Sequence, residues 1–419
     1  MRLPGLLGAG RRVWQLAAGL LIGAAIGLLG GIYLDQIYPA DVPALGYSQP
    51  AKGKLDQQTL DRALRVLQTN YYDPRFDYAK LSQGTIKGLV QGLNDPFSYY
   101  LDPTEYQRQL NTYAGRYVGI GIEVGYQAEY PTVITVFVDS PADKAGLKAG
   151  DVLLKADGHD LHNINSDQAT LLIRGPAGSP VVLTVRRNGQ VQDFKVTRGN
   201  VVIPSVRSTK LEDGMLYIRI YSFGESTGSD FDRLLKAGLA GSGGVVVDLR
   251  DDGGGFIDAA QNVVSQFVAS GEAFELRDRN GNVERHDVNG DHPAAATPVV
   301  VLVNSNTASA AEIVSGSLSV RRKAPLVGTV TYGKGSVQQD FPLPDGSDLH
   351  ITIKRWYLPD GTSVDRVGLH PTDEVPLPAP DQMYDVARPG AGHAADSQLN
   401  AALSLLEHSA AVVPSRAAG

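Results

Sequence analysis

The stretch from Thr297 to Gln338 reads TPVVVLVNSNTASAAEIVSGSLSVRRKAPLVGTVTYGKGSVQ, and it decides the fold. It opens with a continuous apolar run, Val299–Val303, which predicts a strand buried on both faces. The polar residues that follow lead into Ala308–Val314, whose pattern predicts the beginning of a helix. A second strand is expected over Leu326–Tyr332. The order of strand, helix and strand indicates an α/β core.

Two residues of this stretch carry reactive groups. Ser309 lies at the predicted strand-to-helix turn, close to unpaired helix amides that can stabilise an oxyanion. Lys334 lies between Gly333 and Gly335, which allow a sharp turn. Serine and lysine form a nucleophile–base pair if burial lowers the lysine pKa well below its usual value of about 10.4. On an extended chain Gln338 would share a face with Lys334 and could hold its amine. Without further support, a helix cap and a solvated loop lysine explain the same residues.

The composition excludes several classes of protein. The chain has 419 residues with 42% hydrophobic content, which allows two or three domains with substantial cores. Its net charge of −7 and the lack of a basic run argue against nucleic acid as a partner. With no cysteine, the sequence contains neither a disulfide framework nor a thiolate metal site. No cluster of His, Asp and Glu has the spacing of metal ligands, so we expect no metal and no cofactor.

The N-terminal region predicts export. Residues Val13–Tyr33 contain no charge and follow Arg11 and Arg12. A run of this length spans a bilayer, and the arginines would place the N-terminus in the cytoplasm. We therefore expect an uncleaved membrane anchor. The alternative is a cleaved signal peptide, whose apolar region is usually about 7–15 residues. In both cases the chain after residue 40 would be exported.

The segment Asn304–Glu312, followed by Gly333–Gly335 and then Gln338, resembles the carboxyl-terminal processing peptidases. The match concerns both residue types and spacing. The resemblance implies that Ser309 is the nucleophile, that Lys334 is the general base, and that Gln338 orients the lysine amine.

A glycine-rich turn provides further support for this resemblance. Residues Arg250–Gly255 resemble the family's LR-x-N-x-GG turn, although Asp252 stands where the family usually has Asn. The resemblance implies that the amide of Gly254, or else that of Gly255, forms the oxyanion hole together with the amide of Ala310. A phosphate cradle is the other use of such a turn, but no Walker lysine and serine follow it.

Residues 114–198 resemble a PDZ domain. Two motifs carry this resemblance, Tyr117–Ile122 and Ser140–Leu153. In a PDZ domain the first motif offers amides to the terminal carboxylate of a peptide, whose backbone pairs with the strand edge. Arg174 lies in a turn that related enzymes use to contact the protease part, and a solvated turn arginine is the alternative. The peptide-binding residues implied by the resemblance are Gly119, Ile120, Gly121 and Ile122.

One further serine has the sequence context of a nucleophile. Gly224–Gly228 fits G-x-S-x-G between a predicted strand and a predicted helix, as in α/β-hydrolases. Such an enzyme also needs an Asp and a later His, and none of the histidines has a supporting pattern. We therefore interpret Ser226 and Thr227 as helix-capping residues.

The resemblance spans residues 55 to 406 and implies an α/β core related to the crotonase and Clp-protease spiral, with an inserted β-rich PDZ domain. The expected organisation is a cytoplasmic stub with a transmembrane anchor (1–34), a linker (35–54), an N-terminal helical region (55–113), the PDZ domain (114–198), the peptidase core (199–376), and a flexible stretch with a C-terminal helix (377–419).

Taken together, the sequence predicts a membrane-anchored serine endopeptidase acting outside the cytoplasm. It would cut proteins near or from C-terminal tails that the PDZ domain recognises, in a bacterial envelope rather than a plastid lumen. Peptide substrates and the membrane are the expected partners, with an activating protein or a homo-oligomer as a further possibility. The rival functions are an inactive PDZ anchor protein and an esterase that uses Ser226.

Overall fold

The computed structural model describes residues 54–127, 129–137, 139–164, 166–202, 204–379, 382–386 and 392–412. The chain divides into two compact units, residues 1–81 and 82–419. In the first unit, helix α2 (Gln57–Asn70) begins at Asp56, whose carboxylate accepts the Thr59 N–H at 3.0 Å. Helix α2 lies within the helical region expected over residues 55–113. Helix α3 covers Tyr78–Gln91.

The centre of the second unit is a six-stranded sheet in the order β10-β11-β12-β15-β16-β19. All neighbours from β11 to β19 are parallel, and only β10 pairs antiparallel. The expected strand Leu326–Tyr332 ends at Gly328, where a Cβ would lie 1.8 Å from the carbonyl oxygen of Val303. The strands cover Val206–Lys210 (β10), Leu216–Ile220 (β11), Val245–Asp248 (β12), Val299–Val303 (β15), Leu326–Gly328 (β16) and Asp373–Glu374 (β19).

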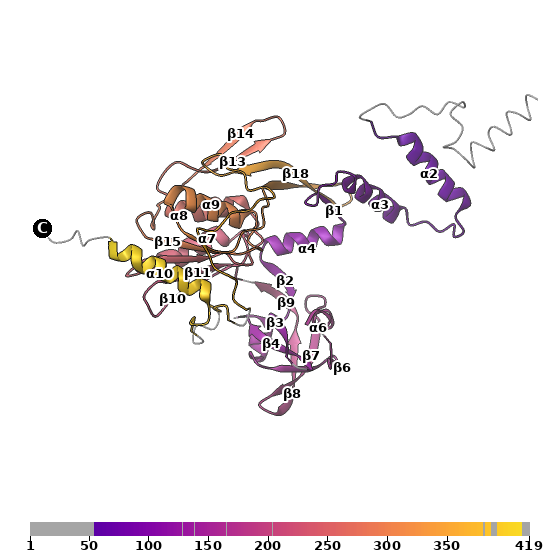
Figure 1. Cartoon of the computed structure of the whole chain (residues 1–419). Coiled ribbons are helices and arrows are strands. Elements are labelled where there is room, and N and C mark those ends of the chain that lie inside the picture. The colour runs from indigo at the N-terminus through magenta and orange to yellow at the C-terminus, as the bar shows by residue number, and fades with distance from the viewer. Residues whose placement is uncertain are drawn as a thin grey trace, which may run out of the picture. The chain divides into compact units, whose positions relative to one another are not determined.

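Helices cover both faces of this sheet, and successive strand residues point to opposite faces (Figure 1). On one side Val245 and Val247 pack against α7 (Thr227–Leu239), α8 (Ile257–Phe267) and α9 (Ala310–Arg322). On the other side Val246, Val300 and Leu302 pack with residues of α10 (Ser397–Val412). Burial on both faces explains why these strands are continuous apolar runs.

A second, antiparallel sheet has the strand order β1-β18-β13-β14, with β17 also paired to β18. Strands β17 and β18 form an antiparallel hairpin on either side of Asp345 and Gly346. Strand β17 begins two residues after Lys334, so this sheet fixes the position of the chain directly after the lysine. The bounds are Tyr99–Leu101 (β1), Glu272–Asp278 (β13), Val283–Asp287 (β14), Ser336–Pro342 (β17) and Asp348–Tyr357 (β18).

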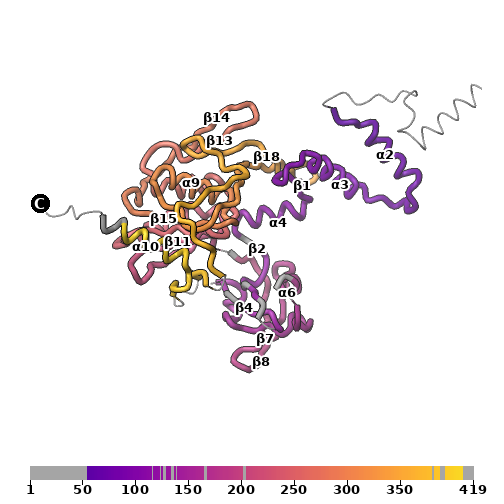
Figure 2. The backbone as a smooth tube through the Cα atoms, in the orientation of Figure 1, coloured from indigo at the N-terminus to yellow at the C-terminus, as the bar shows by residue number. Residues whose placement is uncertain are grey.

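The inserted β-rich domain begins and ends at a pair of strands. Helix α4 (Pro103–Tyr113) leads into β2 (Arg116–Gly119), which pairs antiparallel with β9 (Gly199–Val202). Between them lies a sheet of order β3-β4-β5-β7-β8, with β6 paired to β5; Figure 2 traces this path. Its remaining elements are β3 (Ile122–Gln127), β4 (Tyr130–Val136), α5 (Pro141–Ala145), β5 (Val152–Ala156), β6 (His159–Asp160), α6 (Ser166–Ile173), β7 (Pro180–Arg187) and β8 (Gln190–Thr197).

The expected fold included a transmembrane anchor, and this part of the prediction is corrected. Residues 13–33 lie outside the described part of the chain. Among the described residues no helix is long and apolar enough to cross a membrane, since the longest, α10, has 16 residues and a span needs about 20. The described fold is a mixed α/β core with an inserted β-rich domain.

Candidate active site

Ser309 occupies a strained turn between β15 and α9. Its backbone has φ of 56° and ψ of −117°, a region that residues with a side chain rarely adopt. Such strain persists only where surrounding bonds hold it, and it concentrates at functional sites. Here Thr307 supplies one of those bonds, because its hydroxyl donates to the carbonyl of Leu249 at 2.8 Å. Ser309 as a whole residue is mostly buried, at 8% exposure.

The carboxylate of Glu312 joins the Ser309 turn to the loop that carries Lys334. Its Oε2 accepts the backbone N–H groups of Ser309 and Lys334 at 2.8 and 2.9 Å. Its Oε1 accepts the Gly333 N–H at 2.8 Å and the Thr331 hydroxyl at 2.6 Å. Glu312 is fully buried, and hydrogen bonds to an ionised acceptor are the stronger kind.

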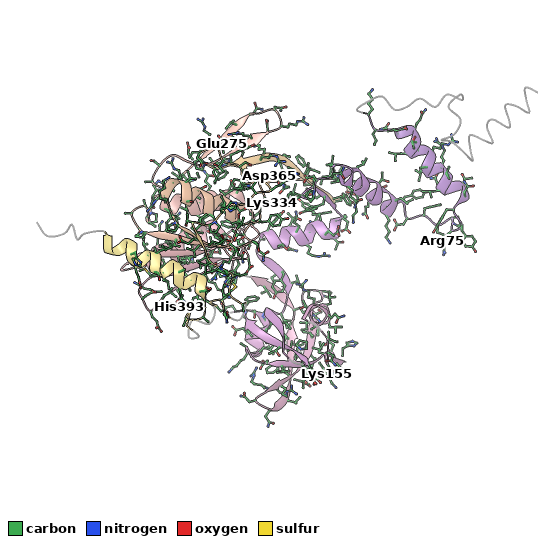
Figure 3. The ribbon with its side chains drawn as sticks, viewed as in Figure 1. Arg75, Lys155, Glu275, Lys334, Asp365 and His393 are labelled. Carbon is green, nitrogen blue, oxygen red and sulfur yellow. The ribbon has the colours of Figure 1, made fainter. Side chains whose placement is uncertain are left out.

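Lys334, labelled in Figure 3, is partly buried. Burial lowers the pKa of its ammonium group, while the carboxylates of Asp95 and Glu312 oppose this shift. The Nζ atom lies 5.0 Å from the ring centroid of Phe97, and the backbone carbonyl accepts the Trp356 indole N–H at 2.9 Å. A lowered pKa is what a lysine general base requires.

Ser309, Lys334 and Gln338 line one cavity of about 480 Å³. Within the described residues, no hydrogen bond joins the Ser309 hydroxyl to Lys334 or Lys334 to Gln338. The Gln338 amide instead donates to the hydroxyls of Ser336 and Thr352, at 2.9 and 3.0 Å. The expectation that Lys334 and Gln338 share one face of an extended chain does not apply, because Lys334 precedes strand β17, which begins at Ser336. The structure thus brings the three residues to one cavity without bonding them.

The glycine turn after β12 lies directly against Ser309. A Cβ on Gly254 would lie 2.8 Å from the Ser309 Cβ and 2.9 Å from the Ala310 nitrogen, so only glycine fits. The Gly254 N–H donates to the Asp252 carboxyl at 2.8 Å. Its carbonyl accepts the Phe223 N–H at 2.9 Å. Because a trans peptide directs its N–H opposite to its C=O, the next amide, that of Gly255, points away from Phe223.

In the inserted domain, the predicted carboxylate-binding turn connects β2 and β3. Gly121 has φ of 84°, and a Cβ there would lie 2.2 Å from the Ser140 Cβ. Ile120 is buried, and its carbonyl accepts the Ala142 N–H at 2.7 Å. Burial raises the pKa of the nearby Tyr117 phenol, and the Gly121 backbone and the charge of Arg174 oppose this shift.

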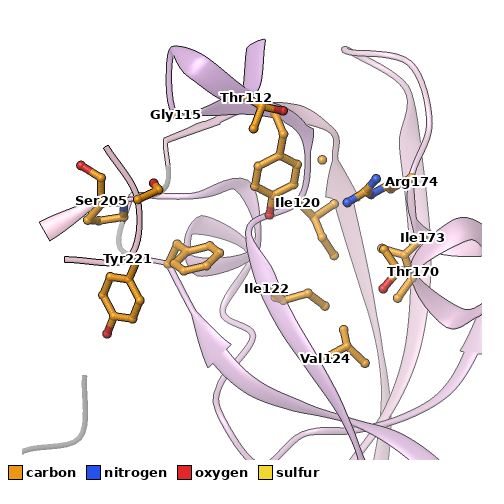
Figure 4. A pocket seen from close by; sticks show the side chains of 15 residues that line it. Thr112, Gly115, Ile120, Ile122, Val124, Thr170, Ile173, Arg174, Ser205 and Tyr221 are labelled. Carbon is orange, nitrogen blue, oxygen red and sulfur yellow. The ribbon is translucent and has the colours of Figure 1, made fainter. Parts of the chain in front are cut away.

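Beside this turn lies a cavity of about 460 Å³ (Figure 4). Apolar side chains of the β3 side, among them Ile120, Ile122 and Val124, face Ile173 at the end of α6. Arg174 also lines the cavity. The arrangement offers an apolar groove with a cation near the turn. That Arg174 senses a peptide bound in the PDZ domain and contacts the protease part remains a prediction. Core residues at the same cavity include Ser205 and Tyr221.

Ser226 lacks the surroundings of a nucleophile. It is exposed and makes no side-chain capping bond at the start of α7. Thr227 makes the local bonds instead, since its hydroxyl accepts the Gly224 N–H at 2.9 Å. Within the described residues, no histidine lines the adjacent hollow, which includes Glu225 and Asp258. A capping role fits Thr227 but not the Ser226 side chain.

The sequence interpretation missed a histidine–aspartate pair that lines the Ser309 cavity. His350 on β18 contacts Asp340 on β17 at 2.5 Å and stacks on Tyr99 at 4.6 Å between ring centroids. All three line the cavity. The pair lies across two neighbouring strands, so only the register of the hairpin could have indicated it.

Comparison of the sequence with protein-family models and with known proteins identifies the family to which the chain belongs. The model of peptidase family S41 matches residues 214–375, and the PDZ domain model matches residues 118–197. Carboxy-terminal processing protease CtpB of Bacillus subtilis is 31% identical over 373 residues, covering 87% of this chain and 77% of that protein. The chain belongs to the carboxy-terminal processing peptidases. It is a serine-type peptidase with a PDZ domain, as the motifs around Ser309 and Tyr117 predict.

Three further comparisons extend this result to other relatives and to the N-terminal region of this peptidase. A carboxy-terminal-processing protease of Bartonella bacilliformis is 35% identical over 320 residues, which are 74% of this chain and 73% of that one. The model of the activating protease CtpB N-terminal domain matches residues 39–104. The crystal structure titled putative S41 protease from Bacteroides fragilis is 19% identical, with a TM-score of 0.55 over 86% of this chain and 99% of that one. It shares the fold.

Proposed function

We propose that this peptidase cleaves polypeptides with Ser309 as the nucleophile and Lys334 as the general base. The observation that carries the proposal is that a strained serine and a lysine of lowered pKa line one cavity, with Glu312 bonded to both backbones. Neutral Lys334 would take the hydroxyl proton as the serine attacks the scissile carbonyl, and return a proton to the leaving amine.

The oxyanion would be held by two backbone amides. The Ala310 N–H at the beginning of α9 is one, because the first amides of a helix have no intrahelical acceptor. For the second, the choice lay between Gly254 and Gly255. Since Asp252 already accepts the Gly254 N–H, we assign this role to Gly255, whose amide points away from Phe223.

The dyad would form when substrate binds. In the described structure the Ser309 hydroxyl and Lys334 are not hydrogen-bonded, and catalytic bonds often tighten only in the enzyme–substrate complex. Gln338 would then turn from Ser336 and Thr352 to orient the lysine amine. A peptide tail in the PDZ groove, read by Arg174, would favour this arrangement.

The remaining parts of the proposal concern setting and partners. The charge-free stretch after Arg12 supports an exported catalytic part, in a bacterial envelope. Substrates would present a free, apolar C-terminus to Gly119–Ile122. An activating protein or a homo-oligomer fits the match to an activating-protease N-terminal domain at residues 39–104.

A serine-directed phosphonate probe, applied in the presence of a tail-bearing peptide and followed by peptide mapping, tests this proposal. Labelling is expected at Ser309. Labelling at Ser226 would support an esterase, and a folded protein without any labelled serine would support an inactive PDZ anchor.

A further inference from the structure

Asp252 is buried in the glycine turn that packs against Ser309, the proposed nucleophile. Its exposure is 0%, and its Oδ1 accepts the Gly254 N–H at 2.8 Å. Its backbone carbonyl accepts the Ala308 N–H at 2.9 Å, one residue before Ser309. The second carboxyl oxygen, Oδ2, is buried and has no hydrogen-bond partner among the described residues. This side chain therefore hydrogen-bonds to the oxyanion turn with one oxygen, while its other oxygen has no hydrogen-bond partner among the described residues.

These surroundings favour the neutral acid. An ionised carboxylate with an unpaired buried oxygen is costly, whereas a protonated one is much less so. Burial accordingly raises the pKa of Asp252 well above its ordinary range. Two charged groups act on it from neighbouring strands: Arg219 on β11 opposes the shift, and Asp248 on β12 adds to it. Lys334 lines the same cavity as Ser309 and Gly254.

We propose that Asp252 is a positioning residue that supports catalysis only as the neutral acid. In that form it matches an asparagine in shape and in its Oδ1 acceptor, and it fixes the Gly253–Gly255 turn. Once ionised, it places a negative charge beside the oxyanion that the turn must stabilise. Like charges repel strongly in a buried site. The same charge favours the protonated form of Lys334, which cannot act as a base.

This inference rests on the proposed function and predicts a second limb in the pH profile. The rate rises with pH as Lys334 loses its proton and falls again as Asp252 loses its own. The falling limb belongs to Asp252 alone. Asp252→Asn should remove it, because the amide keeps the Oδ1 acceptor and never ionises.

The experiment measures kcat/KM for a tail-bearing peptide against pH in the full chain and in Asp252→Asn. The wild type should lose about tenfold per pH unit above the Asp252 pKa, and Asp252→Asn should stay level there. The matched control is Asp251→Asn, a neighbouring carboxylate whose side chain is 42% exposed; it should keep the falling limb whatever its absolute rate. A limb that persists in Asp252→Asn, or a folded Asp252→Asn protein inactive at every pH, would overturn the inference.

Thermal unfolding gives a second readout that does not depend on activity. A carboxyl with a raised folded-state pKa stabilises the fold fully below its unfolded pKa of about 3.9, and this contribution is lost as the pH rises to the folded value. The melting temperature of the wild type should therefore fall more steeply with pH than that of Asp252→Asn. Parallel curves, or an Asp252→Asn protein without a cooperative transition, would contradict a neutral Asp252. A wild type that cleaves nothing at any pH would instead refute the proposed function.

Discussion

Oε2 of Glu312 lies 2.9 Å from the backbone nitrogen of Lys334 and accepts its hydrogen bond. The same atom accepts the N–H of Ser309 at 2.8 Å. One buried carboxylate oxygen thus fixes the backbones of both proposed catalytic residues. The spacing of about 25 residues along the chain becomes a short distance in space because α9 and β16 return the chain to this point.

Replacing Glu312 with glutamine should therefore loosen the site. Glutamine has one acceptor oxygen and would set a donor against an N–H group, so at least one charge-assisted bond is lost. We expect the free energy of unfolding to fall by about 2–3 kcal/mol. We also expect kcat to fall by roughly 10- to 100-fold, since a misplaced dyad slows the chemical step. Thermal denaturation and steady-state kinetics measure the two effects. Glu225→Gln, at an exposed position, is the control and should change neither.

The pH dependence of cleavage should report Lys334. Because burial lowers its pKa, the rate should rise with pH through a value below the ordinary lysine pKa of about 10.4. Lys334→Arg should be inactive at all pH values, since a guanidinium does not give up its proton. The partly exposed Lys236→Arg serves as the control and should keep the wild-type rising limb. An active Lys334→Arg enzyme with an unchanged profile would remove Lys334 from the mechanism.

The PDZ turn should discriminate a free C-terminus from an amidated one. Amidation removes the charge that the backbone amides hold, which costs about 10- to 100-fold in affinity at 1.5–3 kcal/mol per bond. Gly121→Ala should abolish this discrimination, because its Cβ would lie 2.2 Å from that of Ser140. Gly189→Ala is matched to it, with φ of 79° but no atom within 4 Å of its Cβ. Fluorescence anisotropy with paired peptides measures the ratio. Equal binding of both peptides to the wild type would refute the role of the turn.

The sequence predicts the elements of the core well, for a physical reason. Strands such as Val299–Val303 are buried on both faces, so their apolar runs are unambiguous, and the structure confirms this one as β15. The glycines at 254 and 255 were also informative, because close approach to Ser309 and Phe223 leaves no room for a side chain.

What the sequence could not predict depends on contacts between distant segments. The Asp340–His350 pair requires the register of β17 with β18. Arg250 forms a fully buried ion pair at 2.9 Å with Asp396, which lies 146 residues further along the chain. The raised pKa of Asp252 results from its burial, which no local pattern indicates. The expected length of the strand β16 was wrong for the same reason, since the strand ends at Gly328. The orienting role of Gln338 stays a prediction.

The most direct test of the dyad compares cleavage by the wild type, Ser309→Ala and Ser226→Ala on one tail-bearing protein substrate. Purified Ser309→Ala should lose at least about 1,000-fold in kcat while melting like the wild type, because the nucleophile is gone and the fold is not. Ser226→Ala should cleave at the wild-type rate. Turnover by Ser309→Ala at the wild-type rate, or its loss in Ser226→Ala alone, would contradict the assignment of Ser309 as the nucleophile.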